Sequence, residues 1–177
     1  RFPRGTFIIL DLPFTCVIAH KYLKVSMPGV SVNLIQEAGS EIVEGAINIV
    51  PTCFIQQTRF PDIDFLFNAH SFGEMDNDTM LFFKGQIEHN LQPKYLFQIN
   101  RFLNCFVGTD EIRKNHSLGS IWMNNLWSVL DFEFDPWFSR LECIEAREKR
   151  VLKLIIKRNL ERDNQTEEIH LKDLEAR

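Results

Sequence analysis

The sequence predicts an α/β fold with a mostly parallel sheet that ends in an antiparallel hairpin. Short apolar runs alternate with stretches of helical periodicity, which is the pattern of repeated β-α-β units. The runs are apolar almost throughout, as expected for strands that are covered on both faces. Several of these runs end abruptly in polar residues. The length of 177 residues suits one domain, and we predict that it covers residues 1–160 and is followed by a charged tail over 161–177.

The first third of the chain contains three strand candidates and one helix. FIILDLP, residues 7–13, is an apolar run ending in Asp and Pro, which predicts a buried strand. PFTCVIAHKYL follows with proline in its first turn, which favours a helix, and Pro28 with Gly29 ends that helix. VSVNLIQ and AINIVP, at 30–36 and 46–51, predict two more strands, and EAGSEIVEG between them is a turn or a short helix.

The remainder of the chain continues the alternation and then loses it. IDFLFNA at 63–69 and KYLFQIN at 94–100 predict strands, and apolar residues three to four apart predict a helix over 79–90. The tryptophan-rich stretch 122–139 predicts a late strand, whose tryptophan rings either stack on a sugar or belong to the core. RVLKLIIKR at 150–158 fits a strand or a helix, and we favour a strand in a terminal antiparallel hairpin.

Composition and charge exclude several classes of function. The net charge of −4 argues against nucleic-acid binding, which needs a basic surface. No apolar run approaches the roughly 20 residues of a membrane-spanning helix, so we expect no membrane partner. The N-terminal stretch is similar to a signal peptide, but Asp11 interrupts its apolar region. The four cysteines are widely spaced without a CxxC pair, which predicts no metal site, free thiols and a cytoplasmic location.

Polar side chains stand at the ends of three predicted strands. They are Asp11 after the first run, Asn68 with His70 after the run at 63–69, and Asn100 with Arg101 after the run at 94–100. The carboxyl ends of parallel strands lie at one edge of a sheet, where ligands bind in open α/β folds. The sequence therefore predicts a ligand site at this edge.

Several side chains at or just after these strand ends have a structural alternative. Asp11 can bind the hydroxyls of a ribose, or it can cap the helix that begins at Pro13. Ser71 and Glu74 fit the S-x-x-E capping box of a helix. His70 is a structural residue or a base that removes a proton from a substrate hydroxyl. Arg101 binds a carboxylate or phosphate, or it pairs with a nearby acid on the surface.

Three segments together resemble a known family. FIILDLP, FLFNAHSFGEM and KYLFQINRF are similar to sequences of the sugar O-methyltransferase family, which belongs to the class I S-adenosylmethionine-dependent methyltransferases. The N-x-x-S-F-x-E-M block with a downstream N-R is the most specific part, and the resemblance spans residues 5–105. It implies a Rossmann-like sheet, S-adenosylmethionine as cofactor, and methyl transfer to a hydroxyl of a sugar or similar small molecule.

The resemblance also assigns roles to individual residues. Asp11 is expected to hold the ribose hydroxyls of S-adenosylmethionine. Asn68, His70 and Ser71 are expected beside the methionine end of the cofactor and the acceptor, with His70 or Glu74 as the base. Asn100 and Arg101 at the next strand end are then the candidates for binding the acceptor.

The residues before Asp11 depart from the family pattern. The class I fold has a first strand and a glycine-rich turn ahead of the ribose-binding Asp, whereas Gly5 is the single glycine among the first ten residues. Because the sequence also begins with Arg1 rather than Met, we expect that an upstream part with the first strand of the sheet is missing. The alternative function is a catalytically inactive α/β domain that serves as a partner-binding or structural module. The acceptor, the methylated position and the oligomeric state are left open.

Overall fold

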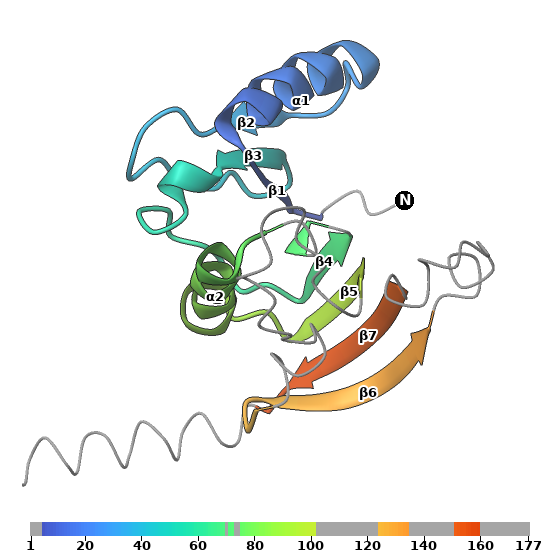
Figure 1. Ribbon diagram of the computed structural model, residues 1–177. Helices are drawn as coiled ribbons and strands as arrows, with labels where there is room; N and C mark the ends of the chain where they lie inside the picture. The colour runs from blue at the N-terminus through green and yellow to red at the C-terminus, as the bar shows by residue number, and fades with distance from the viewer. Residues whose placement is uncertain (1–4, 70, 73–74, 102–123, 135–150, 160–177) are drawn as a thin grey trace, which may run out of the picture. The chain divides into compact units, whose positions relative to one another are not determined.

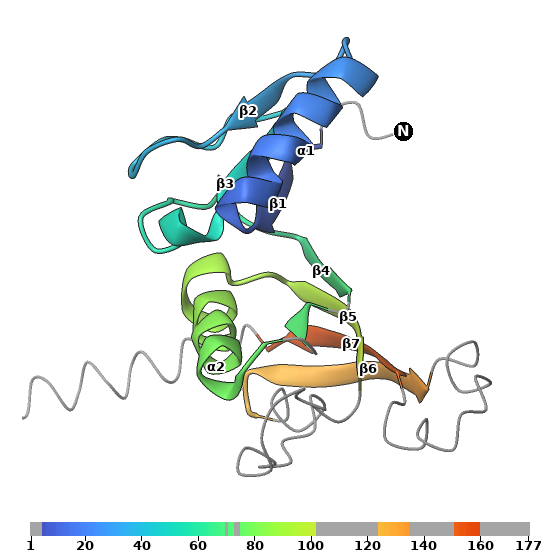
Figure 2. The same ribbon diagram turned by 45° about the horizontal axis from the view of Figure 1, so that its top comes forward.

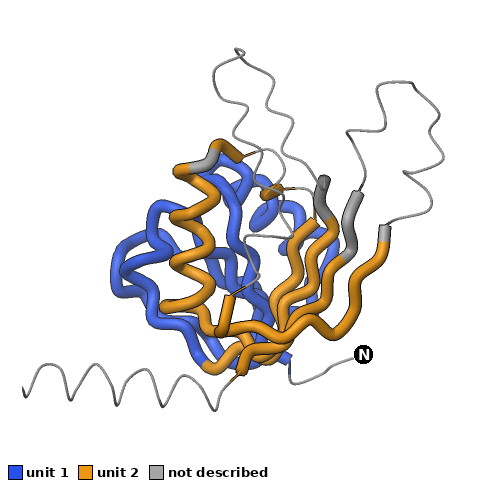
Figure 3. The backbone as a smooth tube through the Cα atoms, turned by 60° about the horizontal axis from the view of Figure 1, so that its bottom comes forward, with its two compact units in different colours: residues 1–61 blue, residues 62–177 orange. Residues whose placement is uncertain are grey.

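The computed structural model describes residues 5–69, 71–72, 75–101, 124–134 and 151–159; for residues 77, 100, 101, 134 and 151–153 it describes the backbone alone. The chain divides into two compact units, Arg1–Pro61 and Asp62–Arg177, which are coloured separately in Figure 3. Each unit has its own sheet and is described by itself (Figure 1).

The described helices and strands follow the predicted order, and Figure 1 labels them along the chain. Their bounds are β1 Phe7–Asp11, α1 Pro13–Ser26, β2 Val32–Leu34, β3 Ile47–Pro51, β4 Phe65–Ala69, α2 Asn77–Gln86, β5 Tyr95–Arg101, β6 Trp127–Phe134 and β7 Val151–Arg158. A short 3-10 turn, Thr52–Phe54, follows β3, and a π-helical turn, Ile87–Leu91, extends α2.

Unit 1 is a parallel three-stranded sheet in the order β1-β3-β2, covered on one face by α1 (Figure 2). Pro13 lies in the first turn of α1, where a backbone N–H has no partner within the helix. The missing N–H of proline therefore costs no hydrogen bond. The buried side chains of β3 and of the residues after β2 form the core, with Ile35, Ile49 and Val50 at most 2% exposed. Parallel pairing brings the carboxyl ends of the three strands to one edge, where Asp11 lies opposite Pro51.

Unit 2 is a mixed sheet in the order β4-β5-β7-β6. β4 and β5 are parallel, whereas β7 is antiparallel to both of its neighbours, β5 and β6, with a bulge in β6 between Val129 and Asp131. The predicted antiparallel pairing at the end of the sheet is thereby confirmed, and β7 covers Val151–Arg158 of the ambiguous RVLKLIIKR. Leu96, Leu154 and Ile156 are fully buried on one face of this sheet.

The helix α2 connects β4 to β5 and lies beside the sheet in both views (Figures 1 and 2). Its buried side chain Met80, together with Ile87 and Leu91 of the π-helical turn, contributes to the core of unit 2. Asp76 caps its amino end by accepting a hydrogen bond from the Thr79 backbone N–H at 2.7 Å, a contact that lowers the pKa of Asp76. Helix and π-helical turn together cover the helix predicted over 79–90.

An α/β fold with parallel strands is therefore confirmed, but its strands form two sheets in place of the single predicted sheet. Within the described residues, β1 pairs with β3 alone and β4 pairs with β5 alone. The single domain over 1–160 stays a prediction. Among the helices described, none is long and apolar enough to cross a membrane.

Candidate functional site

The carboxyl edge of the parallel pair β4 and β5 carries four of the predicted site residues. The strands are in register, with Asn68 opposite Gln98 and Ala69 opposite Ile99, so both strands end at the same edge. Asn68 lies near the end of β4 and Ser71 follows that strand, whereas Asn100 and Arg101 are the last residues of β5. The structure thus brings these two predicted strand ends together, as expected for parallel neighbours.

Asn68 and Ser71 contact each other directly. The Asn68 amide Nδ2 donates a hydrogen bond to the Ser71 hydroxyl, and the Ser71 backbone N–H donates to the Ala69 carbonyl at 2.9 Å. Ser71 is exposed, so its hydroxyl stays accessible beside the amide. This pair offers hydrogen-bond donors and acceptors to a polar ligand.

The capping-box alternative for Ser71 does not apply to α2. That helix begins at Asn77, and its cap is the Asp76 carboxylate rather than Ser71. His70 and Glu74, the two candidate bases, lie outside the described residues. The described part of this edge therefore supplies binding groups, and neither an amide nor a hydroxyl titrates near neutral pH.

Asp11 lies at the end of β1 in unit 1 and is half-buried. Its carboxylate Oδ1 accepts a hydrogen bond from the Leu12 backbone N–H at 2.7 Å, and its backbone carbonyl accepts one from the Cys16 thiol at 3.3 Å. The residue at the capping position of α1 is Leu12, which makes no side-chain cap. Asp11 therefore does not cap α1. Among the described residues, its Oδ1 accepts a hydrogen bond and its Oδ2 accepts none.

Cys16 is the buried neighbour of Asp11. Burial raises the pKa of the Cys16 thiol above its usual value, and the negative charge of Asp11 raises it further. Cys16 is therefore a neutral hydrogen-bond donor that fixes the backbone after Asp11. Asp11 belongs to unit 1, whereas the Asn68–Ser71 pair belongs to unit 2.

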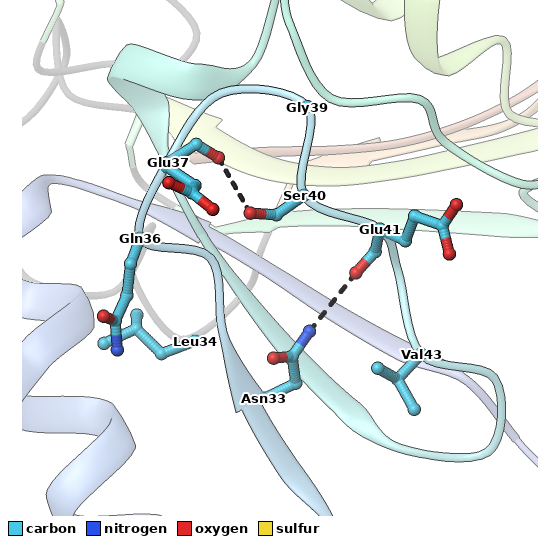
Figure 4. A pocket seen from close by; sticks show the side chains of 8 residues that line it. All are labelled: Asn33, Leu34, Gln36, Glu37, Gly39, Ser40, Glu41 and Val43. Carbon is cyan, nitrogen blue, oxygen red and sulfur yellow. Dashed lines mark hydrogen bonds between the residues drawn. The ribbon is translucent and has the colours of Figure 1, made fainter.

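Sequence reasoning missed a hollow of about 790 Å³ in unit 1, on the loop between β2 and β3 (Figure 4). Its lining residues are Asn33, Leu34, Gln36, Glu37, Gly39, Ser40, Glu41 and Val43. The Ser40 hydroxyl donates to the Glu37 carbonyl at 3.0 Å, while the carboxylate of Glu41 points away from this contact (Figure 4). Its polar side chains do not converge on one point, so the hollow has no defined binding geometry.

The loop around this hollow is held by Asn48, a fully buried residue in the middle of β3. Its Oδ1 accepts hydrogen bonds from the Val43 backbone N–H at 2.8 Å and from the Asn33 amide at 3.0 Å, and its Nδ2 donates to the Val43 carbonyl at 2.9 Å. The sequence signal was a single polar residue inside the apolar run AINIVP. Burial of this polar side chain is tolerated because its oxygen and its nitrogen both have hydrogen-bond partners.

Unit 2 contains a second buried polar group, Glu88 in the π-helical turn, which is 4% exposed. Its carboxylate accepts hydrogen bonds from Lys84, from the Asn124 amide at 2.7 Å and from the Trp127 indole at 3.0 Å. Burial alone raises the pKa of Glu88, but these three hydrogen bonds together hold that pKa below its usual value. Trp127 is thus a core residue rather than a sugar-stacking one.

In comparisons with known proteins, no family model, no curated protein and no solved structure matches the chain. Among the described residues, no group of three or more His, Cys, Asp or Glu side chains is placed to hold a metal ion.

Proposed function

We propose that the chain is the core of an S-adenosylmethionine-dependent O-methyltransferase acting on a hydroxyl of a sugar or similar small molecule. The observation that carries this proposal is Asp11. It ends a parallel strand, it does not cap the following helix, and one carboxylate oxygen has no hydrogen bond among the described residues. A carboxylate in this position is suited to accept hydrogen bonds from the two hydroxyls of a ribose.

Two features of unit 2 support the same proposal. The Asn68–Ser71 pair sits at a parallel strand end, where the resemblance implies the methionine end of the cofactor and the acceptor. The parallel pair β4 and β5, followed by antiparallel β7, is compatible with the mostly parallel Rossmann-like sheet that the resemblance implies. Asn100 and Arg101 end the neighbouring strand and remain the candidates for acceptor binding, with His70 or Glu74 as base.

The cofactor, when bound, supplies an activated methyl group on a sulfonium. The protein then needs to bind the cofactor and the acceptor, to orient them and to exclude water, because positioning provides much of the rate enhancement in such transfers. Asp11 would fix the ribose, and the Asn68 amide and Ser71 hydroxyl would hydrogen-bond the charged amino-acid end. The base would take the proton of the acceptor hydroxyl.

Calorimetric titration of S-adenosylhomocysteine into the full-length protein tests the proposal. Asp11→Ala should weaken binding by about 1–3 kcal/mol, because charge-assisted hydrogen bonds to the ribose are lost. Asp131→Ala is the matched control, since Asp131 accepts the same local hydrogen bond from the next residue, Phe132, at 2.9 Å and lies at no predicted site. Unchanged affinity in Asp11→Ala, or an equal loss in both variants, would remove the assignment.

The second candidate function is a non-catalytic module that binds a partner protein. It is favoured by the apolar side chains that α1 exposes. A folded full-length protein that fails to bind S-adenosylhomocysteine would leave this function in place of the enzyme.

A further inference from the structure

The helix α1 carries apolar side chains on two opposite sides. One side faces the sheet, where α1 contacts all three strands and buries Cys16 completely. The other side exposes four apolar residues in a row, which we name the outer stripe. The exposed fraction of each residue is given in parentheses: Phe14 (77%), Ile18 (53%), Tyr22 (68%) and Val25 (83%). A helix on the surface of a sheet normally turns polar residues outward, so the outer stripe indicates a surface that is covered by another element.

The area of the outer stripe is that of a small protein interface. Phe14 and Tyr22 have side-chain areas of roughly 200 Å² each, and with the smaller Ile18 and Val25 the stripe exposes about 400 Å² of apolar surface. Two copies would bury about 800 Å² from the stripes alone, and the flanking Val17 and the Lys21 stem bring the total near the roughly 1,000 Å² of a specific interface.

We propose that the outer stripe is the contact surface of a homodimer, in which α1 packs antiparallel against α1 of a second copy. Phe14, Ile18 and Tyr22 are four residues apart and form one ridge of the helix, the kind of ridge that interdigitates in the commonest class of helix packing. A two-fold axis through Ile18 sets Ile18 against Ile18 and Phe14 against Tyr22 of the second copy. The ridge is therefore complementary to itself, as a two-fold interface requires.

The charges of α1 favour the antiparallel orientation. The helix bears Lys21 and Lys24 and has no acidic residue between Pro13 and Ser26. Parallel packing would set Lys21 beside Lys21 of the other copy, whereas antiparallel packing separates the lysines. It also places the positive amino end of each helix dipole beside the negative carboxyl end of its neighbour.

Sedimentation of the full chain over a concentration series tests the dimer, with two substitutions that add the same charge. Ile18→Lys lies at the centre of the stripe, and Val43→Lys is its matched control, because Val43 is 45% exposed in the same unit outside α1. Wild type and Val43→Lys should dimerise alike, while Ile18→Lys raises the dissociation constant by more than about tenfold. A wild type that stays monomeric up to about 100 μM, or an Ile18→Lys variant that dimerises like wild type, would overturn the proposal.

Disulfide trapping tests the register without depending on a destabilising charge. With the axis through Ile18, Ile18→Cys faces its own copy and should form a covalent dimer on oxidation, because a disulfide needs closely spaced Cα atoms. Val25→Cys lies opposite the start of the other helix and should show only the level of cross-linking given by the native cysteines. Cross-linking of Val25→Cys above that of Ile18→Cys would refute this register, and circular dichroism confirms that both variants are folded.

Discussion

Replacing Glu88 with alanine should strongly destabilise unit 2. Glu88 is 4% exposed, and its carboxylate accepts hydrogen bonds from Lys84 and from the side chains of Asn124 and Trp127. Removing one partner of a buried charged pair costs about 3–5 kcal/mol, because the groups left behind are desolvated without compensation. Lys84 is 20% exposed and can reach water, so we expect the lower end, about 3 kcal/mol.

Urea unfolding followed by tryptophan fluorescence measures this loss. Glu88→Gln should cost less than Glu88→Ala, because its amide oxygen still accepts from Trp127 and Asn124. Glu41→Ala is the control, since it removes the same side chain from an exposed loop position and should change the free energy of unfolding by less than about 0.5 kcal/mol. A loss below about 1 kcal/mol in Glu88→Ala would refute the view that the hydrogen bonds of Glu88 stabilise unit 2.

Three further predictions concern pH, Asn48 and one glycine. The pKa of Glu88 is lower in the folded than in the unfolded state, so the ionised carboxylate stabilises the fold above the unfolded pKa. This stabilisation is lost as the pH falls through the folded pKa. The urea midpoint should therefore fall less steeply from neutral to acidic pH in Glu88→Gln than in wild type. Asn48→Ala should cost about 1–3 kcal/mol and speed hydrogen exchange at the Val43 amide, which donates to Asn48, and unchanged exchange there would contradict the anchoring role. Gly39 has φ of 80°, so Gly39→Ala should lower the free energy of unfolding by about 1–2 kcal/mol, whereas Gly29→Ala, with no such φ and open space around it, should not.

The local elements could be predicted because each depends on a short stretch of sequence. The apolar run FIILDLP became β1, and the helix predicted over 79–90 became α2 with its π-helical turn. The ambiguous RVLKLIIKR is a strand because Leu154 and Ile156 alternate on the buried face of the sheet. Asn68 and Asn100 could be predicted at one edge because their strands are parallel neighbours.

The long-range contacts could not be read from the sequence. Glu88 meets Trp127 and Arg158, which lie 39 and 70 residues further along the chain, and no periodicity encodes such a contact. The division into two sheets depends on which strands pair, and pairing is decided by non-local hydrogen bonds. The sequence predicts Asp11 and Asn68 at one edge because both lie at the ends of apolar runs. Strand pairing instead places β1 and β4 in two different sheets.

Hydrogen–deuterium exchange of the full-length protein with saturating S-adenosylhomocysteine tests the proposed cofactor site most directly. We expect slower exchange at the Leu12 amide, which donates a hydrogen bond to the Asp11 carboxylate, and at the Ser71 amide after β4. Protection at Leu12 that disappears in Asp11→Ala and persists in Asp131→Ala would support a ribose held by Asp11. Saturable binding with unchanged exchange at both amides, or no binding at all, would rule out a cofactor site formed by Asp11 and Ser71.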